Sequence, residues 1–158
     1  MVCKNFEGAI KLDLVNYLAV NDLITSDQHG FMSKRSTCTN LLETLNHWTL
    51  TLRDGYYTRV AYIDFAKAFD SVCHAKLIYK LSNLGISGSL LAILLSYLDQ
   101  RSQQVKIENT LSNTVNVISG VPQGSVLGPI LFVLYINDMG DIFDDSVKSK
   151  YFADDAKL

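Results

Sequence analysis

The chain has no internal linker along which it could divide into separate units. Its 158 residues contain only two prolines, Pro122 and Pro129, and no repeat or Pro/Gly/Ser-rich run interrupts it. A single domain usually has about 100–200 residues. Because 48% of the residues are hydrophobic, a chain of this length buries enough surface to fold without metals or disulfides. The sequence therefore predicts one compact domain.

Membrane proteins and secreted proteins are both excluded by the distribution of apolar residues and cysteines. The longest apolar stretches, 90–95 and 126–136, are shorter than the ~20 residues of a membrane span. The N-terminal residues lack the apolar segment of a secretory signal. Three cysteines without a C-x-x-C spacing are typical of free thiols in a reducing compartment. We expect an intracellular protein without a membrane-spanning segment.

The charge balance does not by itself indicate a nucleic-acid-binding domain. The chain has 14 basic and 16 acidic residues, a net charge of −2, whereas a free-standing nucleic-acid binder is usually basic. Its acids are 13 Asp and 3 Glu. Because Asp is short and favours turns and helix caps, this excess predicts many turns, caps or metal ligands.

Apolar residues recur at helical spacing in five parts of the chain. Either Ser36 or Thr37 suits the N-cap of the second helix, and Gly55 its end. The predicted helices are 6–23, 37–55, 75–84, 89–98 and 131–139.

Strand patterns lie between these helices. Segment 56–65 is rich in β-branched and aromatic residues and is apolar enough for a central strand. Segments 103–108 and 114–119 alternate around a turn, as in a hairpin, and 147–152 begins another strand. The resulting order, αα, β, αα, ββ, α, β, predicts an α+β fold rather than a doubly wound one.

Three carboxylates follow directly on apolar segments and are candidates for chemistry. Asp64 ends the first predicted strand, and Asp154 and Asp155 follow the last. With the two-residue period of a strand, Asp64 lies on the face of Tyr62, and Asp154 on the face of Phe152. If these two strands are neighbours in the sheet, both acids point to one place.

Gathered carboxylates repel one another, which raises their pKa values unless a cation neutralises them. Carboxylate oxygens favour Mg²⁺ or Mn²⁺. Two such ions about 3.5–4 Å apart activate an attacking hydroxyl and stabilise a leaving pyrophosphate, so the pattern indicates phosphoryl or nucleotidyl transfer. The alternative is a solvated polar turn, which is how we interpret the similar pair Asp144-Asp145.

Three segments, in this order and spacing, resemble the catalytic motifs of the reverse transcriptases. They are VAYIDFAKAFDSV (60–72), GVPQGSVLGPILFVLYINDM (120–139) and the aromatic-x-Asp-Asp motif YFADDAKL (151–158). In addition, 27–37 (DQHGFMSKRST) is similar to the fingers-to-palm segment, and 74–107 to the intervening helices. The residues of these motifs look like those of non-LTR (LINE-type, jockey- or CR1-like) retrotransposon polymerases. Group II intron-type and telomerase-like enzymes share the motifs but match VPQGSVLGPILF less well.

The resemblance implies the palm of a right-hand polymerase with partial fingers, in which an antiparallel sheet packs on helices. The palm would be formed by 57–73 and 120–158. The fingers and connecting helices would be formed by 1–56 and 74–119. The thumb has no counterpart in the chain, so the resemblance implies a reverse transcriptase domain fragment truncated at both ends.

The resemblance also implies roles for individual residues. Asp64 and Asp154 would bind two Mg²⁺ or Mn²⁺ ions, with the Phe65 carbonyl assisting and Asp155 completing the acidic cluster. The implied substrate-binding positions are Ala66, Lys67 and Ala68 for the triphosphate, Phe69 as a steric gate against the ribose 2′-OH, Gln123 and Gly124 beside the incoming nucleotide, and Arg35 on phosphate or template.

The implied function is RNA-directed DNA polymerisation. A primer 3′-hydroxyl would attack the α-phosphate of a dNTP that is paired to an RNA template, in the cytoplasm and nucleus. The alternative is a catalytically inactive, truncated retroelement remnant that acts at most as an RNA- or protein-binding module. The joint presence of the predicted catalytic residues favours the polymerase, and the truncation favours the remnant.

Overall fold

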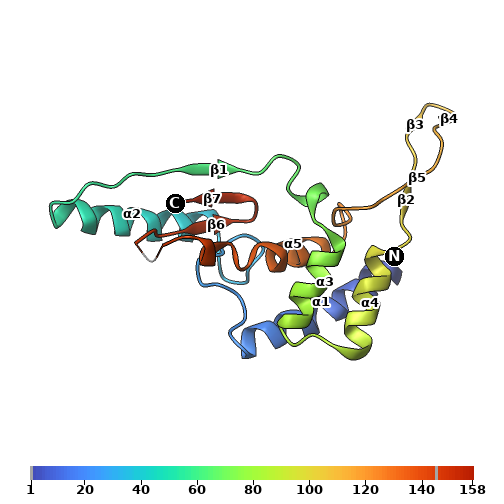
Figure 1. The fold of residues 1–158 in the computed structure, drawn as a ribbon, viewed down its shortest axis with the longest axis horizontal. Coiled ribbons are helices and arrows are strands. Elements are labelled where there is room, and N and C mark those ends of the chain that lie inside the picture. Colours follow the sequence, from blue (N-terminus) through green and yellow to red (C-terminus); the bar gives the residue numbers. More distant parts are fainter. Residues whose placement is uncertain (1, 145) are drawn as a thin grey trace.

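The computed structural model describes residues 2–144 and 146–158, with side chains from residue 4 onward. Figure 1 shows a body of helices at one end of the molecule and a small sheet beside a single helix at the other. The mixture of helices with small antiparallel sheets is that of the predicted α+β class. The helices are α1 (Val2–Val20), α2 (Thr37–Arg53), α3 (His74–Asn83), α4 (Gly88–Leu98) and α5 (Gly128–Ile136).

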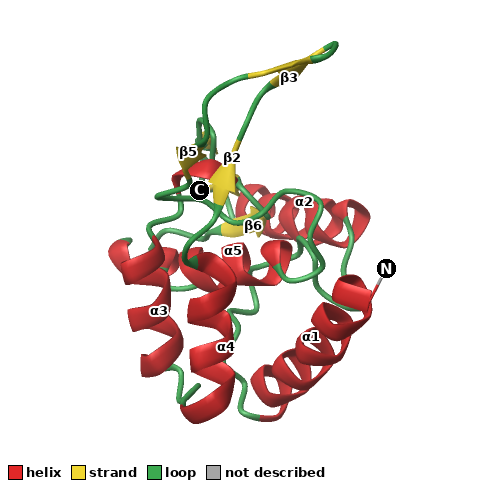
Figure 2. Cartoon of the chain, turned by 90° about the vertical axis from the view of Figure 1, so that its right-hand side faces the viewer, coloured by secondary structure: helices red, strands yellow, loops and turns green. Residues whose placement is uncertain are grey.

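The hydrophobic core lies among α1, α3, α4 and α5. Helix α3 packs against both α4 and α5, and Figure 2 shows α1, α3 and α4 grouped on one side of the molecule. Helix α5 is apolar on every side because it runs through the interior. The fully buried leucines of this cluster are Leu14, Leu18, Leu77, Leu81, Leu94, Leu98, Leu127, Leu131 and Leu134.

Helix α5 begins three residues earlier than the sequence predicts. Pro129 lies in its first turn, where proline suits a helix because the missing N–H needs no partner there. The carboxylate of buried Glu7, on α1, accepts hydrogen bonds from the N–H groups of Val126 and Leu127 at 2.7 and 3.3 Å. These bonds satisfy donors at the start of α5 and join α1 to it.

No helix in the described part of the chain has the length and apolar character needed to cross a membrane. Cys38 and Cys73 are free thiols, as the cysteine spacing predicts, and the side chain of Cys3 lies outside the described residues.

A three-stranded antiparallel sheet contains the segments that end in the candidate acids. Its order is β1 (Tyr62–Asp64), β7 (Asp155–Lys157) and β6 (Lys150–Phe152). The prediction of a ten-residue central strand at 56–65 is wrong, since β1 has three residues, lies at the sheet edge and leaves Tyr62 70% exposed. The central strand is β7, which pairs with both others.

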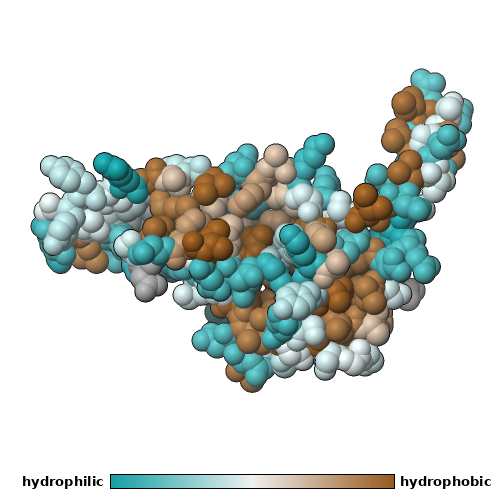
Figure 3. Space-filling model, in the orientation of Figure 1, coloured by the Kyte–Doolittle hydropathy of each residue, from teal (hydrophilic) through white to brown (hydrophobic). Residues whose placement is uncertain are grey.

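The predicted hairpin is confirmed, with a different turn. Strand β2 (Ser102–Gln103) pairs with β5 (Val115–Asn116), and β3 (Lys106–Ile107) pairs with β4 (Thr110–Leu111). The chain reverses at Glu108–Asn109 rather than at 109–113. The hairpin projects from the helical body (Figure 1), and Figure 3 shows apolar side chains exposed along it.

Helix α2 packs with its polar side against the sheet. Of the two candidate N-caps of α2, the structure has Ser36. Its side chain accepts a hydrogen bond from the Thr39 N–H, and Thr39 Oγ1 accepts one from the Ser36 N–H. The buried residues of α2 are Asn40 and Thr44. Its apolar stripe is exposed in the described chain, at Leu41, Leu42, Leu45 and Leu52.

A polar network explains why α2 has this orientation. Lys150 Nζ, on β6, lies 2.9 Å from Asp27 Oδ1 and 2.8 Å from Glu43 Oε2, so one ammonium joins the sheet, the 21–36 segment and α2. Buried His29 lies beside it, with Nδ1 2.9 Å from Thr39 Oγ1 and Nε2 3.5 Å from Glu43 Oε2. Burial lowers the pKa of His29, and the hydrogen bond from Lys150 lowers the pKa of Glu43.

The helical core predicts a large cost for shortening a buried leucine. Leu77→Ala in α3 should lower the free energy of unfolding by about 2–5 kcal/mol, because it leaves a cavity at a fully buried position. The matched control is Leu42→Ala, whose side chain is 61% exposed and whose effect should stay within about 0.5 kcal/mol. Urea unfolding followed by circular dichroism measures both, and equal losses would contradict this description of the core.

His29 predicts that stability falls in mild acid. Because its pKa is lower in the folded chain than the ordinary 6.5, the unfolded chain takes up the proton first as the pH falls below 6.5. The free energy of unfolding should therefore decrease between about pH 7 and about pH 5, above the range in which Glu43 titrates. In a His29→Gln variant this decrease should be smaller, and an unchanged pH profile would assign it to another group.

Candidate functional site

Two of the three candidate acids lie side by side. Asp64 on β1 and Asp155 on β7 are directly opposite each other in the antiparallel register. Opposed residues place their side chains on the same face of a sheet, with Cβ atoms about 4.5–5.5 Å apart. Both residues are exposed, so their carboxylates face an accessible surface rather than the core.

The third acid occupies a different position from the one expected. The sequence argument paired Asp64 with Asp154 if their strands were neighbours, but β7 lies between β1 and β6. Asp154 therefore lies in the turn that connects β6 to β7, beside Asp155 along the chain and outside the strand register. Asp144 is exposed, as expected of a solvated loop, and Asp145 lies outside the described residues.

The acids match the oxygen ligands of a hard divalent cation. Mg²⁺ usually keeps several waters and takes one or two carboxylates together with substrate phosphates. Asp64 and Asp155 place two carboxylates on one face, and Asp154 directly precedes Asp155 in the chain. Within residues 2–144 and 146–158, no three His, Cys, Asp or Glu side chains are gathered as a complete metal site. Two carboxylates on one face match the one or two that Mg²⁺ takes when waters and phosphates complete its coordination.

The same face of the sheet carries two cations one register step away. Lys157 and Lys150 are aligned with Tyr62, two residues along from the aligned Asp64 and Asp155. Lys157 Nζ lies 3.2 Å from Thr44 Oγ1 and 5.8 Å from the centre of the Tyr62 ring, and burial lowers the pKa of this lysine. Lys150 is already paired with Asp27 and Glu43, so Lys157 is the cation of this register step that is not paired with another acid among the ion pairs given above.

A hollow of about 490 Å³ opens between α2 and the sheet, next to the acids. Asp64 and Asp155 line it together with Leu41 and Phe152. A substrate in this hollow would contact both carboxylates and the exposed apolar side chains beside them.

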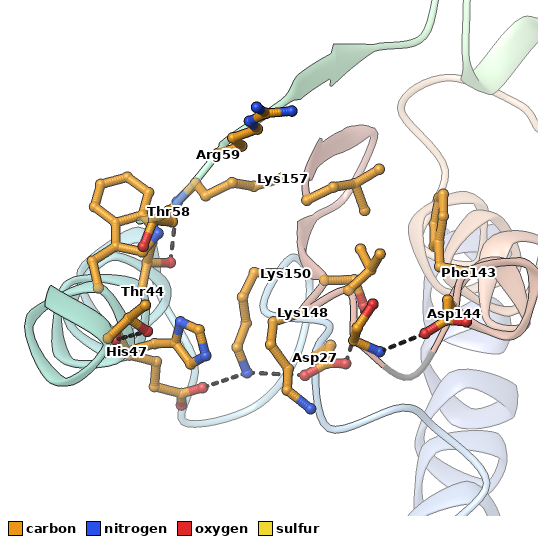
Figure 4. Close-up of a pocket in the computed structure, with 18 of the residues that line it drawn as sticks. Asp27, Thr44, His47, Thr58, Arg59, Phe143, Asp144, Lys148, Lys150 and Lys157 are labelled. Atoms are coloured by element: carbon orange, nitrogen blue, oxygen red, sulfur yellow. Dashed lines mark hydrogen bonds and ion pairs between the residues drawn. The ribbon is translucent and has the colours of Figure 1, made fainter. Parts of the chain in front are cut away.

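A second hollow, of about 790 Å³, lies on the other side of Lys150 and is drawn in Figure 4. Asp27, Lys148, Lys150 and Lys157 are among its lining residues. Figure 4 shows Lys150 joined to Asp27 by an ion pair, and a second ion pair links Lys150 to Glu43. These carboxylates already pair with Lys150, and neither Asp64 nor Asp155 lines this hollow.

Backbone hydrogen bonds join the motif at 60–72 to the motif at 120–139. After β1 the chain turns through Ala66–Ala68 into a 3₁₀ helix, Phe69–Ser71. The Gly120 N–H donates to the Val72 carbonyl at 2.8 Å, and the Val121 N–H donates to the Phe69 carbonyl at 2.9 Å. A side chain at Gly120 would lie 2.9 Å from the Asp70 backbone, and its φ of +89° also favours glycine.

The structure brings Phe69, Gln123 and Gly124 together. They line a hollow of about 320 Å³ with Pro122 and Gly128. The ring of Phe69 stacks on Phe132 of α5 at 4.2 Å between ring centres. Lys67 lines another hollow, of about 650 Å³, which Gln123 and Arg101 also line.

Arg35 has partners within its own segment. Its Nη1 donates to the carbonyl oxygens of Ser26 and Gln28. In this structure the guanidinium braces the chain between α1 and α2, and its contact with phosphate or template stays a prediction.

Three further residues contact the candidate site residues or their neighbours, and the sequence did not predict these contacts. Asp70, whose place after Phe69 suggests a helix cap, accepts a hydrogen bond from Gln123 Nε2 at 2.9 Å. Phe31 places its ring edge-on to Phe69, with centres 6.1 Å apart. Gln28 contacts Ala153, the residue before Asp154. The last two lie in the matching segment 27–37, but periodicity and spacing carry no signal for such long-range contacts.

Known proteins share this arrangement of motifs. The family model described as "Reverse transcriptase (RNA-dependent DNA polymerase)" matches residues 1–158. The chain is 31% identical over 138 residues to the probable RNA-directed DNA polymerase from transposon X-element of Drosophila melanogaster, and 30% identical over 161 residues to that from mobile element jockey of the same species. These matches cover 87% and 98% of the chain.

A more distant relative is the retrovirus-related Pol polyprotein from type-1 retrotransposable element R2 of Popillia japonica, 23% identical over 133 residues and 77% of the chain. The chain spans 15% of the X-element protein, 18% of the jockey protein and 22% of the R2 protein. Since the family model matches from the first residue to the last, and relatives at about 30% identity are polymerases of non-LTR elements, the chain belongs to the reverse transcriptase family, in its non-LTR retrotransposon branch.

Proposed function

We propose that this chain carries the catalytic residues of an RNA-directed DNA polymerase, which joins dNTPs to a DNA primer on an RNA template. The observation that carries the proposal is the register of Asp64 opposite Asp155, at a hollow beside the sheet. The names of the X-element and jockey relatives support the same activity. In this proposal the palm comprises 57–73 and 120–158, and the fingers and connecting helices comprise 1–56 and 74–119.

Asp64, Asp154 and Asp155 would hold two Mg²⁺ or Mn²⁺ ions, assisted by the Phe65 carbonyl. When bound, such ions favour loss of the proton from the primer 3′-hydroxyl and neutralise charge on the triphosphate. The chain's own contribution is to hold the carboxylates in place before the substrates arrive, because the β1–β7 ladder fixes two of them relative to each other.

The turn after β1 would bind the triphosphate. Lys67 is exposed in a left-handed backbone conformation, with φ of 51°, and lines a hollow with Gln123. Backbone N–H groups of Ala66, Lys67 and Ala68 and the Lys67 ammonium are suitable partners for phosphate oxygens. Gln123, held by Asp70 next to Gly124, would contact the incoming nucleotide.

Phe69 would select deoxyribose by its bulk. Its ring is held on two sides, stacked on Phe132 and touched by the edge of Phe31, so it does not swing aside at small cost. A fixed ring beside the sugar leaves no space for a 2′-hydroxyl, the group that distinguishes RNA precursors from DNA precursors.

Removing the charge of one paired acid should abolish polymerisation without unfolding the chain. Asp64→Asn and Asp155→Asn should each lower primer extension on an RNA template by about a hundredfold or more, while the free energy of unfolding changes little, because both residues are exposed. Asp13→Asn, an exposed acid on α1, is the matched control. Extension of a labelled primer, with Mg²⁺ and with EDTA, measures the effect.

Wild-type extension by Asp64→Asn would contradict the proposed role of the acids. A wild-type chain that binds RNA but extends no primer would favour the inactive remnant instead.

A smaller side chain at Phe69 should relax the choice of sugar. Phe69→Val should lower the ratio of kcat/KM for a dNTP to that for the matching ribonucleotide by about tenfold or more, since it opens space for the 2′-hydroxyl. Phe69→Tyr, which keeps the ring, should preserve the ratio, and Phe6→Val is an exposed control. If Phe69 were only a packing residue, Phe69→Val would slow both substrates equally and leave the ratio unchanged.

A further inference from the structure

We infer that Gln28 is a positioning residue for the turn that carries Asp154, an inference that rests on the proposed function. Gln28 lies between α1 and α2 and is 1% exposed. Its Oε1 accepts one hydrogen bond from the Ala153 N–H at 3.0 Å and another from the Gly30 N–H at 2.7 Å. One buried side-chain oxygen therefore ties this segment to the residue that precedes Asp154.

Backbone hydrogen bonds align the Gln28 segment with β6. The Tyr151 N–H donates to the Asp27 carbonyl, and the His29 N–H donates to the Tyr151 carbonyl, both at 2.9 Å. Gln28 and Tyr151 form a parallel bridge at the outer edge of the sheet. Asn40 Nδ2, from α2, donates to the same Tyr151 carbonyl at 3.1 Å. From this position the Gln28 side chain reaches Ala153, two residues beyond Tyr151.

The contact is too close for any residue but glycine at position 30. A Cβ atom there would lie 2.2 Å from the Ala153 backbone nitrogen. Ala153 itself has a left-handed backbone, with φ of 56°, which is unfavourable for a residue with a side chain. A strained turn persists only when its surroundings hold it, and Gln28 with Gly30 supplies such contacts.

Loss of the Gln28 hydrogen bonds should affect Asp154 rather than the other two acids. Asp64 and Asp155 are held by the ladder between β1 and β7, whereas Asp154 lies in the turn. Adjacent carboxylates repel each other, so a turn freed from Gln28 would relax toward a conformation that separates Asp154 from Asp155. Partners that orient metal ligands in this way commonly change metal affinity 10- to 100-fold.

The same short segment reaches the proposed sugar site. Phe31, which follows Gly30, contacts the Phe69 ring, and Arg35 braces the segment through the carbonyls of Ser26 and Gln28. Residues 28–31 thus join the acid-bearing turn to the ring that would select deoxyribose.

The test compares side chains that keep or lose the acceptor oxygen, in the complete 158-residue chain. Gln28→Met keeps the length but removes the amide, Gln28→Asn is too short to reach Ala153, and Gln28→Glu keeps an acceptor oxygen in place. Gln104→Met, on the exposed hairpin, is the matched control. The readouts are Mn²⁺ affinity by electron paramagnetic resonance, amide hydrogen exchange of Ala153 by NMR, and the folded fraction by circular dichroism.

We expect Gln28→Met and Gln28→Asn to weaken Mn²⁺ binding by about 10- to 100-fold and to accelerate exchange of the Ala153 amide. Gln28→Glu should restore amide protection and bind Mn²⁺ at least as tightly as the wild type. A purely structural role would lower the folded fraction and leave the Mn²⁺ affinity of the folded molecules unchanged, and so would overturn the inference. Gln28→Asn decides the question if Gln28→Met does not fold.

Asp64→Asn, measured in parallel, separates the two possible failures. If Asp64→Asn loses Mn²⁺ affinity and the folded Gln28 variants do not, the role of Gln28 is contradicted while the metal site stands. If Asp64→Asn and the Gln28 variants all bind Mn²⁺ as the wild type does, the proposed metal site itself is contradicted.

Discussion

The antiparallel pairing of β1 with β7 is the interaction on which the candidate site depends. Asp64 and Asp155 lie opposite each other on adjacent strands, with Asp154 next in the chain, and like charges so placed destabilise a sheet. The fold accommodates them at an exposed sheet face, with Lys157 and Lys150 one register step away. Adjacent like charges lower the stability of a sheet. In the proposed function, a divalent cation that binds together with the substrate would offset this repulsion.

Contacts between segments that are distant in sequence hold this face together. The carboxylate of Glu7 accepts a hydrogen bond from the Val126 N–H just before α5, and the loop before α5 is hydrogen-bonded to the 69–72 turn. These bonds join Phe69 and Gln123 to the helical core. On the other side, the chain before α2 lies along β6 and touches the acid turn. Hydrogen bonds thus connect the turn that carries Asp154 to the segment before α2.

Much of the fold can be predicted from the sequence. Helical spacing located all five helices to within a few residues, and the hairpin and strand β6 were found from alternation and turn chemistry. One error concerns placement, since 56–65 is apolar yet yields only a short edge strand. The structure also shows the leucines of α2 facing outward, which the spacing did not predict. A residue pattern reports amphipathicity but not which surface a neighbour covers, and α2 turns its polar side inward because Lys150 and the Tyr151 carbonyl offer it polar partners.

The sequence by itself determined which residues are candidates: the three acids follow apolar segments, and Phe69 and Gln123 lie in contiguous motifs that resemble those of the family. Only the tertiary structure decided that Asp155, not Asp154, faces Asp64, since sheet order depends on which strand enters between the other two. It also revealed the contacts of Gln28, Phe31 and Asp70. These contacts join residues 38–125 positions apart, over which spacing along the chain carries no information about proximity in space.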